Sequence, residues 1–532
     1  MLHKDSLVRG AFILAAGSLL SRGLGAVYRL LLPMLVGGGQ QGAYALGLYN
    51  YSYRIYSVAL VLSTVGLPLA VSRLVSQRLA QDDGAGARRV FTAARGLLAA
   101  VGLVITLGLA AVAPGFARTV DPNALYPILA IAPAVFLVSL MSAYRGLFQG
   151  MQVMTPYAVS QVVEQIVRVA TILAAAVLLL PWGIPAAMAG ASFGAVTGAG
   201  AGLVYLWYVM RRHREHLDRV LAAGRPRAGG AWPGIIREIL ALAVPISLAS
   251  LAFPVISLID LSVPVLLQSR GMDAEAATTA YGALSQAEPF LNVPLTLTTG
   301  FALSLVPAIT EAASQGRGSR VQRGIGASLR IALIITIPAV AGLMLLAHDL
   351  AAAFYDYPAA GTPLQVLALA ALFIGLQQMS SGVLQGLGRP MVPVRHLAWG
   401  VAVKALLTWL LVPAWGVTGA AAATVSAFTV TALLNLASVA RLAGWSDFGA
   451  GNVAKPVAAS LVMAAAVTAL RAVLVPRLPL LAVTLAVAAA GVVVYGAALL
   501  VLGGVRAADL ELAPGLARRV LPALRRWRLI RD

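Results

Sequence analysis

The feature that most constrains this chain is a succession of apolar runs, each long enough to cross a membrane, along almost its whole length. A helix needs about 20 apolar residues to span a bilayer. Of the 532 residues, 60% are hydrophobic and only 11% are charged, whereas a soluble domain carries about 25% charged residues. A soluble protein of this length could not cover its surface with so few charges. The composition therefore excludes an ordinary cytosolic enzyme and predicts a polytopic membrane protein.

The apolar runs predict an all-α fold with 14 transmembrane helices. The first run is too long for a signal peptide and contains two Arg, so we interpret it as a span. The expected spans lie near residues 10–36, 45–69, 90–113, 125–149, 157–181, 185–210, 236–263, 282–310, 325–347, 363–387, 393–413, 417–440, 453–475 and 479–503.

The basic residues predict the orientation of these spans. With the N-terminus inside, 30 of the 39 Lys and Arg fall in inside segments and only four fall in outside loops, as the positive-inside rule requires. We therefore expect a multi-pass membrane protein with both termini cytoplasmic. The net charge of +20 then reflects topology and attraction to anionic lipid, and it does not indicate a nucleic-acid partner.

An internal repeat divides the chain. Residues 146–151 (GLFQGM) recur as 382–387 (GVLQGL), and the same offset places Arg168 on Lys404. Spans 1–6 and 7–12 are therefore predicted to be two parallel six-helix lobes, the organisation of an alternating-access transporter. The expected parts are an N-terminal lobe with a basic cytoplasmic linker (1–233), a C-terminal lobe (234–445), an extra helix pair (446–504) and a basic interfacial tail (505–532). We expect the linker to be a solvated, flexible hinge.

Three Arg in the first two spans are the strongest functional signal. A charged side chain within a span costs roughly 2.5–3.5 kcal/mol on insertion scales, so each is expected to have a partner or a function. Arg22 and Arg29 lie seven residues apart and so share one helix face, and Arg54 follows in span 2 among four Tyr. Arg pairs with phosphate through two parallel hydrogen bonds and stays charged when desolvated. These residues predict a water-filled cavity for an anionic phosphate or diphosphate group, although snorkelling or pairing with carbonyls is the alternative.

Span 5 places Glu164 four residues before Arg168, the favourable spacing for a helical ion pair. Two interpretations stay open for this pair. It is either a self-neutralised structural pair inside the lobe, or it lines the cavity and positions Arg168 for the ligand.

The second lobe carries a different set of polar residues. Asp260 in span 7, Glu288 and Asn292 in span 8, and Lys404 in span 11 are candidates for coupling to a cation or for gating. The alternative is charge balance against Lys404 and helix capping. A Na⁺ site in this lobe is conceivable but no ligand set can be assigned to it, and we expect no other metal and no cofactor.

The motifs Ser21–Arg29, Ser63–Ser76, Glu164–Arg168, Tyr281–Ser285 and Leu305–Ile309 resemble the stage V sporulation protein B group. That group lies among the MurJ-like lipid II flippases of the multidrug/oligosaccharidyl-lipid/polysaccharide exporter superfamily. The resemblance covers nearly the whole chain. It implies a flippase that moves an undecaprenyl-diphosphate-linked peptidoglycan precursor from the inner to the outer leaflet of the bacterial plasma membrane.

The resemblance also assigns roles to residues. It implies that the first-lobe cavity holds the diphosphate and sugar, and that spans 13 and 14 form a groove for the lipid tail. Arg22 falls on the Arg of the family's first-span motif, and Glu288 lies near a carboxylate expected in span 8. The implied partners are the lipid-linked oligosaccharide and a coupling cation (Na⁺ or H⁺) or the membrane potential, and we expect a monomer.

Other functions stay open at this point. Another lipid-linked polysaccharide unit could be the substrate on the same fold. A drug extruder should favour an acidic cavity, which the three Arg argue against. An integral-membrane glycosyltransferase would need clustered carboxylates or His, but the five His are dispersed. We therefore expect a protein without enzymatic activity, and no catalytic residue.

Overall fold

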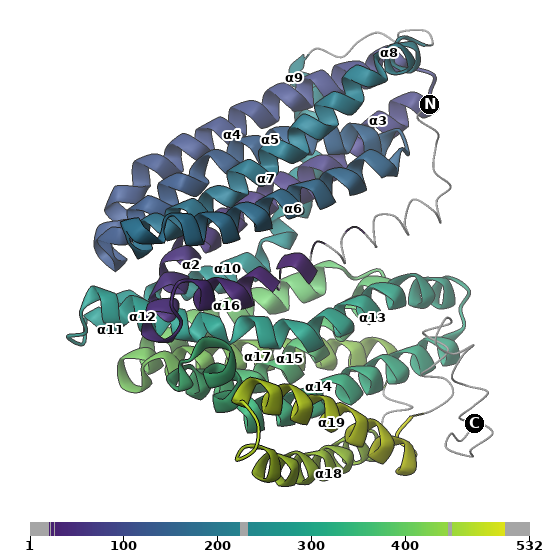
Figure 1. The fold of residues 1–532 in the computed structure, drawn as a ribbon. Helices are drawn as coiled ribbons and strands as arrows, with labels where there is room; N and C mark the ends of the chain where they lie inside the picture. The colour runs from purple at the N-terminus through teal and green to yellow at the C-terminus, as the bar shows by residue number, and fades with distance from the viewer. Residues whose placement is uncertain are drawn as a thin grey trace. The chain divides into compact units, whose positions relative to one another are not determined.

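A computed structural model describes residues 17, 21, 23–25, 27–223, 232–444 and 449–505, and the regular structure of these residues is helical throughout (Figure 1). The long helices of the first half are α2 (Gly39–Val61), α3 (Leu67–Ala80), α4 (Gly84–Val120), α5 (Leu125–Gly150), α6 (Met154–Leu178), α7 (Ile184–Arg212) and α9 (Trp232–Ser250). The long helices of the second half are α12 (Ala274–Gln286), α13 (Glu288–Ser314), α14 (Gly318–Tyr355), α15 (Gly361–Gly386), α16 (Met391–Trp415), α17 (Val417–Ala443), α18 (Gly451–Leu474) and α19 (Leu480–Val501).

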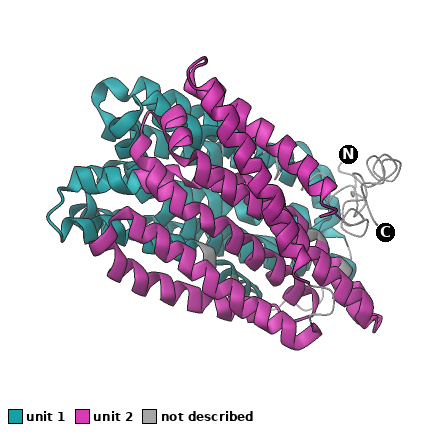
Figure 2. Ribbon diagram, turned by 90° about the horizontal axis from the view of Figure 1, so that it is seen from below, with its two compact units in different colours: residues 1–282 teal, residues 283–532 magenta. Residues whose placement is uncertain are grey.

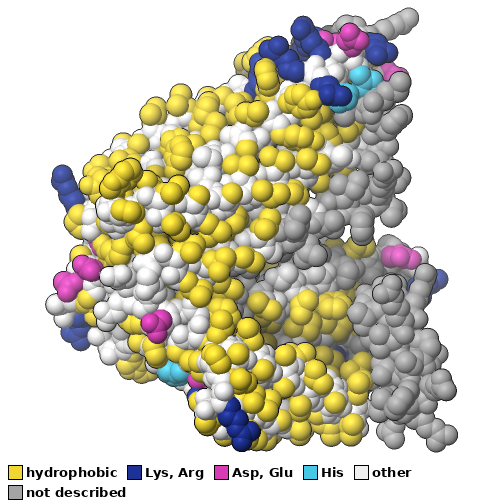
Figure 3. Space-filling view, in the orientation of Figure 1, with side chains coloured by type: hydrophobic (Ala, Val, Ile, Leu, Met, Phe, Trp, Pro, Cys, Tyr) yellow, Lys and Arg dark blue, Asp and Glu magenta, His cyan; other side chains and the backbone are white. Residues whose placement is uncertain are grey.

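Twelve helical segments of the described chain are long and apolar enough to cross a membrane. They coincide with predicted spans 2–6 and 8–14, which confirms the all-α polytopic class. Two shorter apolar helices, Gly23–Leu35 and Pro254–Gln268, overlap the two remaining predicted spans, and the second runs five residues past the predicted end at residue 263. Twelve of the 27 residues in the predicted span 10–36 lie outside the described residues, so the count of 14 stays a prediction. On the visible face of the N-terminal half, apolar side chains cover the helix flanks and charged ones gather at the helix ends (Figure 3).

The chain divides into two compact units, residues 1–282 and 283–532 (Figure 2). The first unit includes α9, because this helix packs against α3. The boundaries predicted from the repeat differ from this division and stay a prediction. The predicted interfacial tail lies outside the described residues from residue 506 onward.

Part of the linker expected to be a flexible hinge is helical. Residues Arg214–Ala222 form α8, and this helix buries Leu217 and Leu221 in the apolar core of the first unit. The backbone N–H of Gly84, at the start of α4, donates to the carbonyl of Ala223 at 3.1 Å. The charged composition of this segment predicts a solvated linker, but two buried leucines attach it to the core of the first unit.

The internal repeat reappears in the helix bounds. In the first unit a 3₁₀ turn over Pro122–Ala124 leads into α5, which has 26 residues. In the second unit a 3₁₀ turn over Pro358–Ala360 leads into α15, which also has 26 residues. The helices α6 and α16 that follow both have 25 residues. These matching elements support the predicted duplication.

The repeated glycines allow two helices to approach closely in each unit. A Cβ added to Gly146 of α5 would lie 2.9 Å from the Cβ of Val71 on α3, and one on Gly150 would lie 2.7 Å from the Ser72 carbonyl oxygen. In the second unit a Cβ on Gly382 of α15 would lie 2.9 Å from the carbonyl oxygen of Ala302 on α13. Small residues four positions apart are typical of membrane helices whose backbones are in contact.

The C-terminal helix pair is held on α14 by polar contacts. Pro338 lies inside α14 and has no N–H, so the carbonyl of Ile334 loses its helical donor. The hydroxyl of Tyr495 on α19 donates to this carbonyl at 2.8 Å. Arg471 on α18 pairs with both carboxylate oxygens of Asp349 on α14. The two spans outside the repeat are thus attached to the second unit at specific points.

Candidate functional site

The predicted seventh span is interrupted twice. After α9, residues Ala252–Ile259 form α10 and Ser262–Gln268 form α11. Pro264 cannot donate to the carbonyl of Asp260, and its ring excludes a regular helix there. The N–H of Leu261 therefore bonds to the Leu258 carbonyl at 3.0 Å instead of the Ser257 carbonyl. The break leaves the carbonyl end of a short helix within the first unit, and such an end favours a cation.

Arg54 on α2 occupies this helix end. Its Nη1 donates to the Ser257 carbonyl at 3.1 Å and to Oδ2 of Asp260 at 3.2 Å. The two charged side chains are only 7% and 9% exposed. Arg54 thus meets a carboxylate and a carbonyl of the helix end together, so Asp260 lies in the same cluster as an Arg that sequence analysis placed in the other lobe.

An aromatic stack supports the Arg54 cluster. The guanidinium carbon of Arg54 lies 5.6 Å from the ring centre of Tyr281 on α12. Tyr281 stacks on Tyr51 at 5.2 Å, and the Tyr51 hydroxyl is 3.0 Å from the hydroxyl of Thr278. These contacts fasten α2 to α12 beside the ion pair.

A second buried cluster contains Glu164 between two Arg. One carboxylate oxygen accepts from Arg168 at 2.7 Å, as the spacing on α6 predicts, and the other accepts from Arg145 on α5 at 2.9 Å. Arg145 also donates to the hydroxyl of Ser160 at 3.0 Å. The sequence analysis counted Arg145 among the inside segments, but the structure buries it within α5. Its position inside the predicted span 125–149 was the signal that could have placed it in this cluster.

A row of tyrosines on α2 joins this cluster to the first span. Tyr49 stacks on Tyr53 at 5.8 Å, and Tyr53 lies 6.2 Å from Tyr56. The guanidinium of Arg29 lies over the Tyr53 ring at 4.8 Å. At one end of the row, Arg168 donates to the Tyr56 hydroxyl at 3.3 Å. We call these three residues the tyrosine row. It places Arg29 and Arg168 on one aromatic surface.

The remaining predicted site residues are not brought into these clusters. Arg22 lies outside the described residues. Lys404 is buried in α16, Glu288 is half-buried as the first residue of α13, and Asn292 is exposed on α13. These three belong to the second unit.

The second charged cluster of the first unit has a net positive charge. Arg54 and Asp260 balance each other, whereas Glu164 is shared by Arg145 and Arg168. One positive charge is thus left in the second cluster, and half-buried Arg29 lies over Tyr53 of the tyrosine row. Guanidiniums at such sites can pair with phosphate oxygens, and tyrosine rings add flat apolar surface and hydroxyl groups.

Comparison with known proteins identifies the family. A model described as "Polysaccharide biosynthesis protein" matches residues 7–313, more than half of the chain, and the MatE model matches residues 245–410. The chain is 30% identical over 467 residues to the protein named lipid II flippase MurJ of Bacillus subtilis (strain 168), covering 83% of this chain and 84% of that protein. The chain belongs to the polysaccharide biosynthesis protein family. The MurJ-like resemblance expected from the motifs is thereby confirmed.

Two further comparisons define the fold and the range of the family. Stage V sporulation protein B of the same organism is 28% identical over 456 residues, covering 82% of this chain and 84% of that protein. A solved structure titled "Lipid II flippase MurJ, inward closed conformation" has a TM-score of 0.61 at 15% identity, covering 92% of this chain and 98% of that chain. This polysaccharide biosynthesis family member therefore has the fold of the exporter superfamily and is a multi-pass membrane transporter.

Proposed function

We propose that this transporter is a flippase for an undecaprenyl-diphosphate-linked peptidoglycan precursor, which it moves from the inner to the outer leaflet. The observation that carries the proposal is the net positive cluster around Glu164, together with the contacts of Arg29 and Arg168 with one row of tyrosines. The similarity to the B. subtilis lipid II flippase over most of both chains supports the substrate class.

The guanidiniums of Arg29 and Arg168 and the rings of the tyrosine row suit the two parts of such a head group. The diphosphate pairs with guanidiniums, and the sugar rings lie against aromatic faces. Arg29 is the proposed primary phosphate ligand, because a bidentate phosphate pair is stronger than the cation–π contact that its guanidinium makes with the Tyr53 ring. Arg168 is held in place by Glu164 and presents its charge beside Tyr56, the next tyrosine of the row.

The Asp260 carboxylate competes with the substrate phosphate for Arg54 during the transport cycle. A phosphate that pairs with Arg54 displaces the Asp260 carboxylate, and the interrupted segment α10–α11 then loses its attachment to α2. Binding of a proton or Na⁺ at Asp260 neutralises it and has the same effect on Arg54. Asp260 is in this way the coupling residue of the first unit, and Glu288, Asn292 and Lys404 are candidates for gating in the second.

The test is translocation of undecaprenyl-diphosphate-linked precursor by the purified full-length protein in vesicles, together with rescue of bacteria depleted of their lipid II flippase. We expect Arg29→Gln to abolish translocation and Arg29→Lys to retain part of it. Arg118→Gln, an exposed Arg of α4, serves as the matched control. Full activity of Arg29→Gln would refute the role of the tyrosine row.

A second candidate substrate is the lipid-linked repeat unit of another polysaccharide. The description of the matching family model favours it. The same vesicle assay decides between the two, because a transporter for other polysaccharides should move their lipid-linked unit and fail to rescue lipid II flippase depletion.

A further inference from the structure

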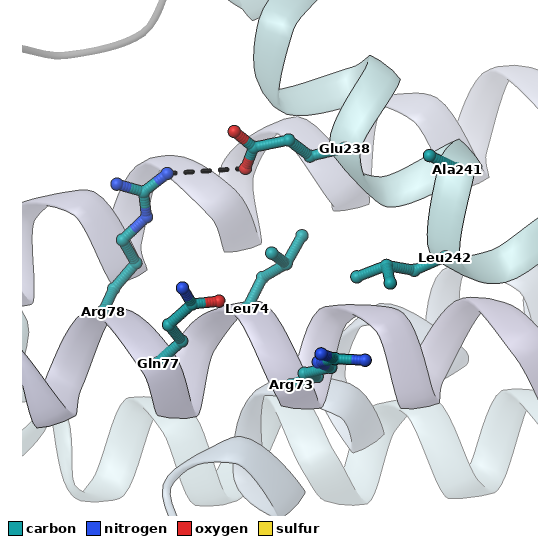
Figure 4. A pocket seen from close by; sticks show the side chains of 7 residues that line it. All are labelled: Arg73, Leu74, Gln77, Arg78, Glu238, Ala241 and Leu242. Atoms are coloured by element: carbon teal, nitrogen blue, oxygen red, sulfur yellow. Dashed lines mark hydrogen bonds and ion pairs between the residues drawn. The ribbon is translucent and has the colours of Figure 1, made fainter.

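A basic pocket of about 370 Å³ opens on the first unit, away from the two charged clusters. Residues of α3 form one wall and residues of α9 form the other (Figure 4). The lining residues are Arg73, Leu74, Gln77, Arg78, Glu238, Ala241 and Leu242. The volume lies at the lower end of the range of small-molecule sites.

The two Arg of the pocket differ in their contacts. Arg78 pairs with Glu238 at 3.4 Å, and the two side chains are 29% and 50% exposed. Such an exposed, long ion pair contributes little stability, so an incoming anion can replace the carboxylate at small cost. Arg73 is exposed and makes no hydrogen bond or ion pair with any residue that the structure describes. The pocket thus has two guanidiniums and one weakly held carboxylate.

The position of the pocket along α3 is that of a membrane boundary. Arg78 lies two residues before the end of α3, and Arg73 lies seven residues before it, or about 10 Å along the axis. Leu74, Ala241 and Leu242 form apolar lining next to these charges. A site with guanidiniums near a helix end and leucines beside them matches a lipid, whose phosphate meets Arg while its glycerol and acyl chains lie against apolar side chains.

We propose that this α3–α9 pocket binds the phosphate of a membrane lipid. The net charge of its lining residues, +1, matches a phosphodiester with one negative charge, as in phosphatidylglycerol. A diphosphate carries more charge than the pocket balances and would be repelled by Glu238. By the predicted topology the pocket lies at the inner boundary of the membrane. Its residues are distinct from those assigned to translocation, so it serves as a lipid site beside the transport path.

Native mass spectrometry of the purified full-length protein tests this assignment without measuring transport. The probes are phosphatidylglycerol, phosphatidylcholine and undecaprenyl diphosphate. We expect phosphatidylglycerol to bind more tightly than phosphatidylcholine, and Arg73→Gln to weaken it about five-fold. Undecaprenyl diphosphate as the tighter ligand, lost in the same variant, would support the phosphate site and assign it to the lipid carrier.

Two further variants make the test specific. Glu238→Gln removes the competing carboxylate, so we expect it to raise the affinity for phosphatidylglycerol. Arg88→Gln changes an exposed Arg near the start of α4, outside the pocket, and should leave binding unchanged. The proposal is overturned if Arg73→Gln loses no more lipid than Arg88→Gln, or if Glu238→Gln weakens binding. A transport-inactive protein that retains this pattern would leave the pocket assignment intact while refuting the flippase proposal.

Discussion

Arg54 donates to Asp260 at 3.2 Å although 206 positions separate them in the sequence. Breaking a buried pair by removing one partner is costly, because it leaves the other charge uncompensated. We expect Arg54→Gln to destabilise the protein by about 3 kcal/mol, and the double variant Arg54→Gln/Asp260→Asn to recover part of that loss. Thermal unfolding of the purified protein in detergent measures both. Strict additivity of the two single substitutions would contradict the pair.

The same variants separate stability from transport. If phosphate and Asp260 compete for Arg54, Asp260→Asn should bind a diphosphate ligand more tightly than the native protein does, because its competitor is gone. Translocation should nevertheless fall, because Asp260→Asn has no carboxylate that can displace the diphosphate from Arg54 when the substrate is released. Equal diphosphate affinity in Asp260→Asn and in the native protein would show that Asp260 does not compete with the substrate in the transport cycle.

Glu164→Gln tests the second cluster. This change leaves Arg145 and Arg168 buried with only a neutral amide between them, and we expect a loss of about 3 kcal/mol of stability. Glu311→Gln is the matched control, since Glu311 is exposed on α13 and should change stability by less than about 0.5 kcal/mol. A similar small effect for both substitutions would show that Glu164 does not hold the two Arg.

Sequence reasoning identified what depends on local spacing and missed what depends on packing between helices. The pair of Glu164 and Arg168 follows from one helical turn, and it is present at 2.7 Å. Arg145 reaches Glu164 only because α5 and α6 bring them together from 19 positions apart. No periodicity encodes such a contact.

The same limit explains the pairing of Arg54. Sequence analysis found both Arg54 and Asp260 as intramembrane charges but assigned them to separate lobes, because the repeat places span 7 in the second. The break at Asp260 could be anticipated from Pro264. The packing of α10 against α2 could not, since it depends on which surface of the broken segment fits the tyrosine-rich helix.

The glycine crossing of α5 and α3 gives a packing prediction. A Cβ on Gly146 would approach the Pro68 carbonyl oxygen at 3.0 Å and the Cβ of Val71 at 2.9 Å. Neither backbone nor a β-branched side chain can yield without moving the helices, so Gly146→Ala should cost about 1–3 kcal/mol. At Gly108 of α4 nothing lies within 4 Å of an added Cβ, so Gly108→Ala should be neutral or stabilising. Equal effects in unfolding measurements would contradict close contact at Gly146.

Tyr495 and Pro338 allow a test of how α19 is attached to α14. Tyr495→Phe removes the donor to the Ile334 carbonyl and should cost about 1 kcal/mol, the usual net value of a hydrogen bond. Pro338→Ala supplies a backbone N–H at residue 338 that can donate to the Ile334 carbonyl, so the hydrogen bond from the Tyr495 hydroxyl becomes redundant. In the Pro338→Ala background, Tyr495→Phe should therefore be nearly neutral. A double-mutant cycle by thermal unfolding measures this coupling, and an undiminished cost of Tyr495→Phe in that background would show that the hydroxyl does not replace the missing helical donor.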